Sequence, residues 1–195
     1  MATVTRWFWV RHGPTHQKAF TGWRDVPADL SDSAAIERLN AFLPAEALII
    51  SSDLDRAVTT ADRLSQGRNR LPHDPDIREF DFGIWDGLHF TQVAERDPDL
   101  SRSFWENPGD IAAPEGESWN AVERRTSAVV DRLMATHKPR DIIAVAHMGT
   151  IMTQIARAGN MTPYKALGHV VDPLSVTCLI HENQNWRIER VNHLP

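Results

Sequence analysis

The apolar residues of this chain fall mainly into short continuous runs, separated by segments whose apolar residues recur at helical spacing. Continuous runs of this length are typical of strands that are buried on both faces of a sheet. Such strands are expected at 4–10, 47–50 and 141–146. Helices are expected at 32–43, 54–66, 118–137 and 149–158.

Individual residues indicate where these helices begin and end. Ser31 or Asp32 can cap the first helix, and Asp53 can cap the second, because short polar side chains accept hydrogen bonds from free backbone N–H groups. Pro44 ends the first helix and Pro139 bounds the long third helix, since proline cannot continue a helix.

The remaining segments are less regular. Residues 77–80 form either a short strand or an extended segment, and residues 174–181 and 186–191 read as a closing hairpin. The stretch 82–116, rich in Trp, Phe, Asp, Pro and Gly, is the least regular part and is expected to form a cap over a site. Strands that alternate with helices predict an α/β fold, a three-layer sandwich with a mostly parallel central sheet flanked by helices.

Composition narrows the class of protein. The 195 residues fit a single domain, 1–195, with 82–116 as a small cap-like insertion, and 42% of the residues are apolar. A formal net charge of -5 disfavours nucleic acids and anionic membranes as partners. The one cysteine, Cys178, lies in a strand-like run and is expected to be a buried, inert thiol. We find no leader-like N-terminus and no run long enough to cross a bilayer, so the expected location is the cytoplasm.

Basic residues follow three of the predicted strands. Arg11 and His12 end the first strand, Arg56 follows the second in the first turn of its helix, and His147 follows the third. Because the carboxyl ends of parallel strands meet at one edge of a sheet, these four side chains are expected to face one pocket. Guanidinium groups and a helix N-terminus bind a tetrahedral dianion well, and a neutral histidine among them can attack phosphorus.

Other interpretations remain open for single residues. Arg56 alone is more typical of a surface ion pair, and clustered histidines can bind metal ions. His12 and His16 have the spacing of metal ligands only on a helix, which Pro14 disfavours, so no metal is expected. A phosphoryl transfer also needs a proton donor for the leaving oxygen. Glu79 and Asp81 are the candidates, and spacing alone does not choose between them.

The motifs together resemble those of the histidine phosphatase superfamily, also called the phosphoglycerate mutase-like family. The matches extend over nearly the whole chain and occur in the family's order. They are Arg11-His12-Gly13-Pro14-Thr15, Phe20-Thr21-Gly22-Trp23, Ser51-Ser52-Asp53-Leu54-Asp55-Arg56-Ala57, Arg78-Glu79, Pro114-Glu115-Gly116-Glu117-Ser118 and Val145-Ala146-His147.

The resemblance implies a role for each matched residue. His12 resembles the nucleophile that becomes phosphohistidine, and Arg11, Arg56 and His147 resemble the phosphate-binding pocket, with His147 also counted as catalytic. Glu79 resembles the general acid, so the resemblance, not the spacing, favours it over Asp81. The family's reaction needs neither a metal ion nor a cofactor.

Some positions depart from the family pattern or extend the predicted site. Lys18 stands where the family often has an asparagine, and we predict that Lys18 and Thr15 also bind phosphate. Thr21 and Gly22 match a pattern whose residues touch the substrate in mutases. Met148 replaces one of the two glycines that usually follow the second histidine, which is expected to narrow the pocket.

The resemblance covers more than one activity. The resemblance implies that mutases of this family are longer chains with two adjacent arginines in the cap. In this chain Arg96 and Arg102 are not adjacent in the sequence. A short cap excludes water poorly, which favours a phosphomonoester hydrolase acting through phosphohistidine on a small phosphorylated metabolite. A cofactor-dependent phosphoglycerate mutase and a non-catalytic phospho-ligand binding module are the alternatives.

Length and motif spacing are similar to the α-ribazole phosphatase and broad-specificity phosphatase branch, which makes α-ribazole phosphate a candidate substrate. The expected partner is a small phosphorylated substrate, and a homodimer stays open. Several aromatic residues could line an apolar specificity pocket, although core packing explains any single one as well. These residues are Trp85, Phe90, Phe104, Trp105 and Trp119.

Overall fold

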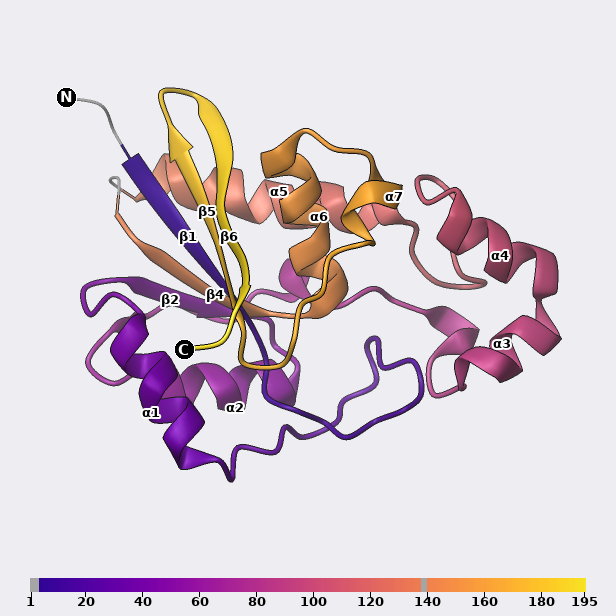
Figure 1. Ribbon diagram of the computed structural model, residues 1–195, viewed down its shortest axis with the longest axis horizontal. Helices are drawn as coiled ribbons and strands as arrows, with labels where there is room; N and C mark the ends of the chain where they lie inside the picture. Colours follow the sequence, from indigo (N-terminus) through magenta and orange to yellow (C-terminus); the bar gives the residue numbers. More distant parts are fainter. Residues whose placement is uncertain (1–3, 138–139) are drawn as a thin grey trace.

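A six-stranded mixed sheet forms the centre of the molecule (Figure 1). The computed structural model describes residues 4–137 and 140–195. The strand order is β3-β2-β4-β1-β5-β6. Strands β3, β2, β4 and β1 are mutually parallel, β5 pairs antiparallel with β1, and the edge strand β6 pairs antiparallel with β5. The strands are β1 (Val4–Arg11), β2 (Leu48–Ser51), β3 (Asn69–Arg70), β4 (Ile142–Ala146), β5 (Val176–Glu182) and β6 (Asn185–His193).

Helices cover both faces of this sheet, which confirms the predicted three-layer α/β sandwich. Helices α1 (Ser33–Phe42) and α2 (Asp55–Leu64) lie on one face, and α5 (Trp119–Thr136) and α6 (Met148–Gly159) lie on the other. The short helices α3 (Phe90–Arg96) and α4 (Pro98–Glu106) stand apart from the sheet, at the right of Figure 1. A one-turn helix, α7 (Pro163–Ala166), follows α6.

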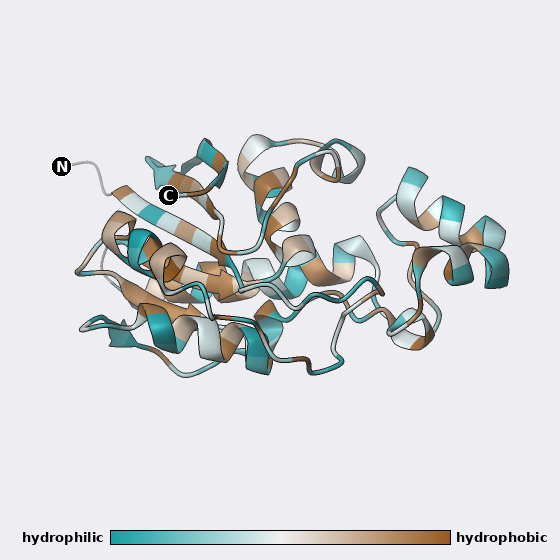
Figure 2. Ribbon diagram, turned by 60° about the horizontal axis from the view of Figure 1, so that its bottom comes forward, coloured by the Kyte–Doolittle hydropathy of each residue, from teal (hydrophilic) through white to brown (hydrophobic). Residues whose placement is uncertain are grey.

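The continuous apolar runs supply two separate cores. Within β1, Trp7 and Trp9 belong to the core beneath α5 and α6, whereas Phe8 and Val10 belong to the core beneath α1 and α2. This division follows from the strand geometry, because successive side chains point to opposite faces of a sheet. In Figure 2 the strands carry brown stretches, and the helices around them carry both teal and brown residues.

The predicted helix boundaries hold with one correction. Asp32 caps α1 by accepting a hydrogen bond from the backbone N–H of Ala35, as predicted. The predicted cap at Asp53 is wrong: Leu54 precedes α2 without a side-chain cap, and Asp53 accepts two hydrogen bonds from Arg78 instead. The Asp53 carboxylate is therefore bound by the Arg78 guanidinium and does not cap the helix. Pro139 lies outside the described residues.

The expectation of irregular structure in 82–116 is wrong, because the segment contains α3 and α4. His89 and Gln92 form a reciprocal capping box at the start of α3, and Pro98 occupies the first turn of α4. These local capping arrangements stabilise short helices in a stretch that has the composition of a loop. Residues 75–77 form a 3-10 turn, so a strand over 77–80 is also wrong and the extended alternative holds.

Two further predictions concern Cys178 and membrane spans. Cys178 lies in β5 and is 2% exposed, as predicted, and burial raises the pKa of its thiol to about 12. A thiol with such a pKa stays protonated and unreactive near neutral pH. Among residues 4–137 and 140–195, no helix combines the length and the apolar character that crossing a membrane requires.

Candidate active site

Three parallel strands end at the same level and bring the predicted residues together. In the sheet register Arg11, the last residue of β1, is opposite Ala146 of β4, and Ser51 of β2 is opposite Val145. The chain therefore turns out of the sheet at neighbouring points, next to His12 and His147. This is the edge at which open α/β sheets bind ligands.

His12 is held in the orientation and tautomer that a nucleophile needs. The side chain is 6% exposed, and its Nδ1 lies 2.7 Å from the carbonyl oxygen of Gly13. A carbonyl only accepts, so Nδ1 must carry the proton and Nε2 keeps its lone pair. Burial, followed by the positive charge of Arg56, lowers the pKa of His12 to about 3, so the ring is neutral at physiological pH.

His147 is fixed in the complementary way. Its Nδ1 accepts a hydrogen bond of 3.2 Å from the Nε–H of Arg56, and because arginine can only donate, the neutral ring carries its proton on Nε2. Burial and the nearby Arg56 charge hold the pKa of His147 well below its usual value. Its Nε2 is buried and has no hydrogen-bond partner in the described part of the chain. The ring centroid lies 5.1 Å from that of His12, so a donor without a partner stands beside the nucleophile.

Two guanidinium groups complete the basic pocket. Arg56 is 1% exposed, and backbone carbonyls fix it: Gly22 at 2.6 Å and Arg24 at 3.0 Å. Arg11 donates to the carbonyl of Val171 at 2.7 Å, while its buried Nε has no partner among the described residues. Neither guanidinium makes an ion pair with a carboxylate of residues 4–137 or 140–195. Guanidinium groups without a directly paired carboxylate favour an anionic ligand.

Glu79 lies at the same site, whereas Asp81 points elsewhere. The Glu79 side chain is 7% exposed, and its two carboxylate oxygens accept from the backbone N–H groups of Phe80 at 2.9 Å and Gly149 at 3.1 Å. At the start of α6, the backbone N–H of Gly149 was expected to face an anionic ligand, but it donates to the carboxylate of Glu79 instead. Asp81 accepts from the N–H of Gly83 and is not among the cavity-lining residues. Glu79, and not Asp81, therefore lines the cavity, and its role as general acid stays a prediction.

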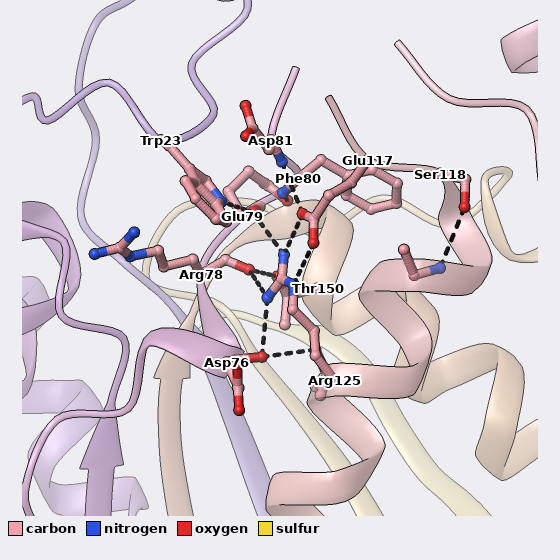
Figure 3. A network of polar contacts seen from close by, with 12 residues as sticks. Trp23, Asp76, Arg78, Glu79, Phe80, Asp81, Glu117, Ser118, Arg125 and Thr150 are labelled. Carbon is pink, nitrogen blue, oxygen red and sulfur yellow. Dashed lines mark hydrogen bonds and ion pairs between the residues drawn. The ribbon is translucent and has the colours of Figure 1, made fainter. Parts of the chain in front are cut away.

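The backbone of Glu79 is also held from two sides (Figure 3). Its carbonyl accepts a hydrogen bond of 2.9 Å from the Trp23 indole and one of 2.8 Å from Arg125 of α5. Arg125 also donates to the carbonyl of Arg78 at 2.8 Å and pairs with Glu117 through two bonds of 2.8 Å. The arginine therefore joins the segment that carries Glu79 to the long helix.

Sequence reasoning missed the role of Arg125. Glu117 and Trp23 lie within quoted family motifs, but Arg125 falls in an amphipathic helix, where an arginine is typical of an exposed face. Its guanidinium donates five hydrogen bonds, three of them to backbone carbonyls and two to Glu117, and only the packing of α5 against the 3-10 turn reveals them.

Arg11, His12, Arg56 and Glu79 line one cavity of about 290 Å³, whereas His147 is fully buried next to His12 and is not among the lining residues. Lys18 and Thr15 lie on its wall, as does Thr21, so three of the predicted binding residues face the same space as His12. The lining residues are Arg11, His12, Thr15, Gln17, Lys18, Ala19, Phe20, Thr21, Arg56, Glu79, Phe82, Phe90, Trp105 and Met148.

Gly22 is placed differently from the other predicted site residues. It is buried and is not among the residues that line the cavity, and its carbonyl holds Arg56. A Cβ at this position would lie 2.4 Å from the carbonyl oxygen of Phe80, so the close approach of two backbone segments requires glycine. Direct contact of Gly22 with a substrate stays a prediction.

Four of the five aromatic residues proposed for a specificity pocket line a cavity. Phe90 lines the main cavity, Phe104 and Trp119 line a smaller chamber next to it, and Trp105 lines both. The prediction is wrong for Trp85, which is fully buried and donates its indole N–H to Asp97 at 2.8 Å. Trp85 therefore packs in the core instead of lining either cavity.

Gly149 provides a direct test of how Glu79 is positioned. A Cβ there would lie 2.5 Å from Oε1 of Glu79 and 2.6 Å from the ring of Phe80. We expect Gly149→Ala to displace the carboxylate and lower kcat about 100-fold. The matched control is Gly109→Ala, where the nearest atom to a Cβ is 3.8 Å away. Steady-state hydrolysis of an alkyl phosphate, whose leaving oxygen needs a proton, measures both variants. Equal kcat values for the two variants would contradict the positioning.

The lowered pKa of His12 predicts how stability depends on pH. The unfolded side chain titrates near 6.5, but the folded one near 3, so between these values the unfolded chain binds more protons. His12 therefore destabilises the fold increasingly as pH falls below 6.5 and has no such effect above it. Relative to His12→Gln, we expect wild-type stability to fall by up to about 1.4 kcal/mol per pH unit in this range.

Urea unfolding of both proteins at several pH values measures the difference in the free energy of unfolding. Other titrating groups largely cancel in that difference, because the two proteins share them. A difference that stays constant from neutral to acidic pH would show that His12 has an ordinary pKa.

Within residues 4–137 and 140–195, no group of three or more His, Cys, Asp or Glu side chains is arranged to hold a metal ion. His12 and His147 use one ring nitrogen each for Gly13 and Arg56.

Known proteins share these sequence and structural features. A bifunctional protein of Mycobacterium tuberculosis, Rv2228c, is 32% identical over 163 residues, which is 76% of this chain but 43% of that protein, so the chain spans less than half of this relative. The adenosylcobalamin/α-ribazole phosphatase of Escherichia coli is 28% identical over 93% of this chain and 92% of its own.

A solved structure, that of the mycobacterial glucosyl-3-phosphoglycerate phosphatase Rv2419c, superposes with a TM-score of 0.83. It is 26% identical and covers 98% of this chain and 100% of its own. The family model of the histidine phosphatase superfamily, branch 1, matches residues 7–194. With His12, Arg56 and His147 gathered at one sheet edge and a match along almost its whole length, the chain belongs to branch 1 of the histidine phosphatase superfamily.

Proposed function

We propose that the protein is a histidine phosphatase-type phosphomonoesterase that acts through a phosphohistidine on His12. One observation carries the proposal: His12, whose Nε2 lone pair is free, lines a cavity together with Arg11 and Arg56, which have no ion-paired carboxylate among the described residues. The ring of His147, whose Nε2 has no partner in the described part of the chain, has its centroid 5.1 Å from that of His12. A nucleophile and donors for a tetrahedral anion are therefore assembled before any ligand arrives.

The first half of the reaction transfers the phosphoryl group to the enzyme. The Nε2 lone pair of His12 forms a bond to phosphorus while the bond from phosphorus to the ester oxygen breaks. Arg11, Arg56 and His147 donate hydrogen bonds to the phosphoryl oxygens, and the electron pair of the broken bond goes to the leaving oxygen. Glu79, in its protonated form, gives that oxygen its proton.

The second half returns His12 to its starting state. Glu79, now a carboxylate, takes a proton from water, whose oxygen forms a bond to phosphorus as the nitrogen–phosphorus bond breaks. The products are the alcohol and inorganic phosphate, and no cofactor takes part. Lys18 and Thr15, on the wall of the same cavity, are proposed to add contacts to the phosphate, and Thr21 and Gly22 to the rest of the substrate.

The cap supports hydrolysis over mutase activity. Arg96 and Arg102 are ion-paired to Asp97 and Asp99, and neither lines the catalytic cavity, so the cap offers no arginine pair for a substrate carboxylate. Segment 82–116 contributes Phe82, Phe90 and Trp105 to the cavity wall, which fits the proposed cap within a single domain.

The physiological substrate is a small phosphorylated metabolite, with α-ribazole phosphate the first to test. The support is the E. coli relative, whose name includes that substrate and which aligns with nearly the whole chain. The solved mycobacterial relative is a glucosyl-3-phosphoglycerate phosphatase, so substrates differ among relatives of similar identity.

A metal-free panel of phosphate monoesters in the presence of a chelator tests the proposal. We expect release of inorganic phosphate, and rapid quenching should trap a phosphoenzyme that is labile to acid and stable to alkali. Isomerisation of phosphoglycerate without phosphate release would instead identify a mutase. Tight phosphate binding without turnover of any ester would identify a non-catalytic phospho-ligand binding module.

A further inference from the structure

A second, apolar chamber of about 40 Å³ adjoins the catalytic cavity. Aromatic and aliphatic side chains form most of its wall, and Glu79 is the single charged residue among those that line it. The lining residues are Glu79, Phe80, Phe82, Phe104, Trp105, Pro108, Ile111, Trp119, Met148, Gly149, Met152 and Leu167.

The chamber and the catalytic cavity share part of their walls. Glu79, Phe82, Trp105 and Met148 line both, so these side chains stand at the junction between the two spaces. Met148 is 40% exposed and unbranched, and a flexible thioether of this kind can move aside at low cost. The family resemblance predicted that Met148 narrows the pocket, and its position at this junction agrees with that expectation.

The position of Glu79 relates the chamber to the leaving group. A general acid must lie within hydrogen-bond distance of the oxygen that it protonates. If Glu79 is the general acid, the ester oxygen of a bound substrate would lie next to it, where the two cavities share their walls. The carbon atoms attached to that oxygen would then be close to Phe82, Trp105 and Met148, which line both cavities.

We propose that this chamber is a subsite for an aliphatic part of the leaving alcohol, so that the enzyme prefers phosphate monoesters of apolar alcohols to those of polyhydroxylic ones. The inference rests on the proposed function, because the proposed mechanism has Glu79 protonate the leaving oxygen. Hydroxyl groups that enter an apolar space lose their hydrogen bonds to water, and methylene groups gain by the same transfer.

The volume limits what the chamber accepts. About 40 Å³ exceeds the roughly 10–15 Å³ that one water requires but is well below the roughly 150 Å³ of a cavity that binds benzene. A short or branched alkyl group fits, whereas an aromatic ring does not. The ring of α-ribazole phosphate would therefore have to lie in the larger cavity, next to Phe90 and Trp105.

The test compares n-butyl phosphate with glycerol phosphate, two primary alkyl esters of similar intrinsic reactivity. We expect wild-type kcat/KM to be about tenfold or more higher for the butyl ester, as for other apolar subsites that discriminate by a methylene or two. Leu167 lines the chamber but not the catalytic cavity. Leu167→Asn should reduce the butyl preference severalfold and leave kcat/KM for glycerol phosphate unchanged.

Matched variants separate the chamber from general effects. Leu194→Asn makes the same substitution at an exposed position outside both cavities and should keep the wild-type preference. If Leu167→Asn fails to fold, Ile111→Asn changes another residue that lines the chamber but not the catalytic cavity, and the wild-type preference needs no variant at all. Equal kcat/KM for both esters in the wild-type enzyme would overturn the subsite while leaving the phosphatase intact, and no hydrolysis of any ester would overturn the proposed function itself.

Discussion

Replacement of His12 by alanine is expected to abolish hydrolysis of phosphate monoesters, with kcat reduced by about 10⁴-fold or more. The hydrogen bond from Nδ1 of His12 to the carbonyl of Gly13 leaves the lone pair on Nε2 free, and this lone pair is the proposed nucleophile. Stopped assays of phosphate release from p-nitrophenyl phosphate measure the loss. The phosphoenzyme trapped from wild-type protein should be absent from the variant.

Phosphate binding provides the control for this variant. Arg11, Arg56 and His147 keep their backbone and side-chain partners when His12 is truncated, so inorganic phosphate should still bind. Isothermal titration of both proteins with phosphate separates a missing nucleophile from a collapsed pocket. Retained hydrolysis near the wild-type rate would mean that another residue attacks phosphorus.

Replacement of Glu79 by glutamine is expected to lower kcat about 10² to 10⁴-fold for alkyl phosphates. Glutamine preserves the size of the side chain but can neither give up nor take up a proton in the way the mechanism needs. The loss in the first half-reaction should shrink for p-nitrophenyl phosphate, because nitrophenolate leaves without a proton. Burst kinetics with the two kinds of ester measure phosphoryl transfer to the enzyme separately from its hydrolysis.

Asp81→Asn is the matched control and also tests the alternative that the sequence left open. Asp81 accepts from the backbone N–H of Gly83, and an asparagine oxygen can accept the same bond. We expect near wild-type rates from this variant with every ester. A larger loss in Asp81→Asn than in Glu79→Gln would exchange the roles of the two carboxylates.

Some features of the fold could be predicted from the sequence only in part. The capping box of α3, formed by His89 and Gln92, involves residues three positions apart, but the many Trp, Asp, Pro and Gly residues around it are typical of a loop and gave no indication of a helix. Asp53 looked like a helix cap because the same side chain suits a cap and an ion pair. Arg78, 25 positions away in the chain, decided between them.

The sequence by itself determined the three-layer fold, the sheet edge at which the site lies, and the identity of Arg11, Arg56, His12 and His147 as its basic residues. These follow from local patterns, because apolar runs set the strands, and residues at or soon after the carboxyl end of a parallel strand lie near that edge. The tertiary structure alone decided the tautomers of the two histidines, the placement of Glu79 rather than Asp81 in the cavity, and the clamp formed by Arg125. Each of these depends on contacts between residues far apart in the chain, and no spacing along the sequence encodes which side chains packing brings within hydrogen-bond distance.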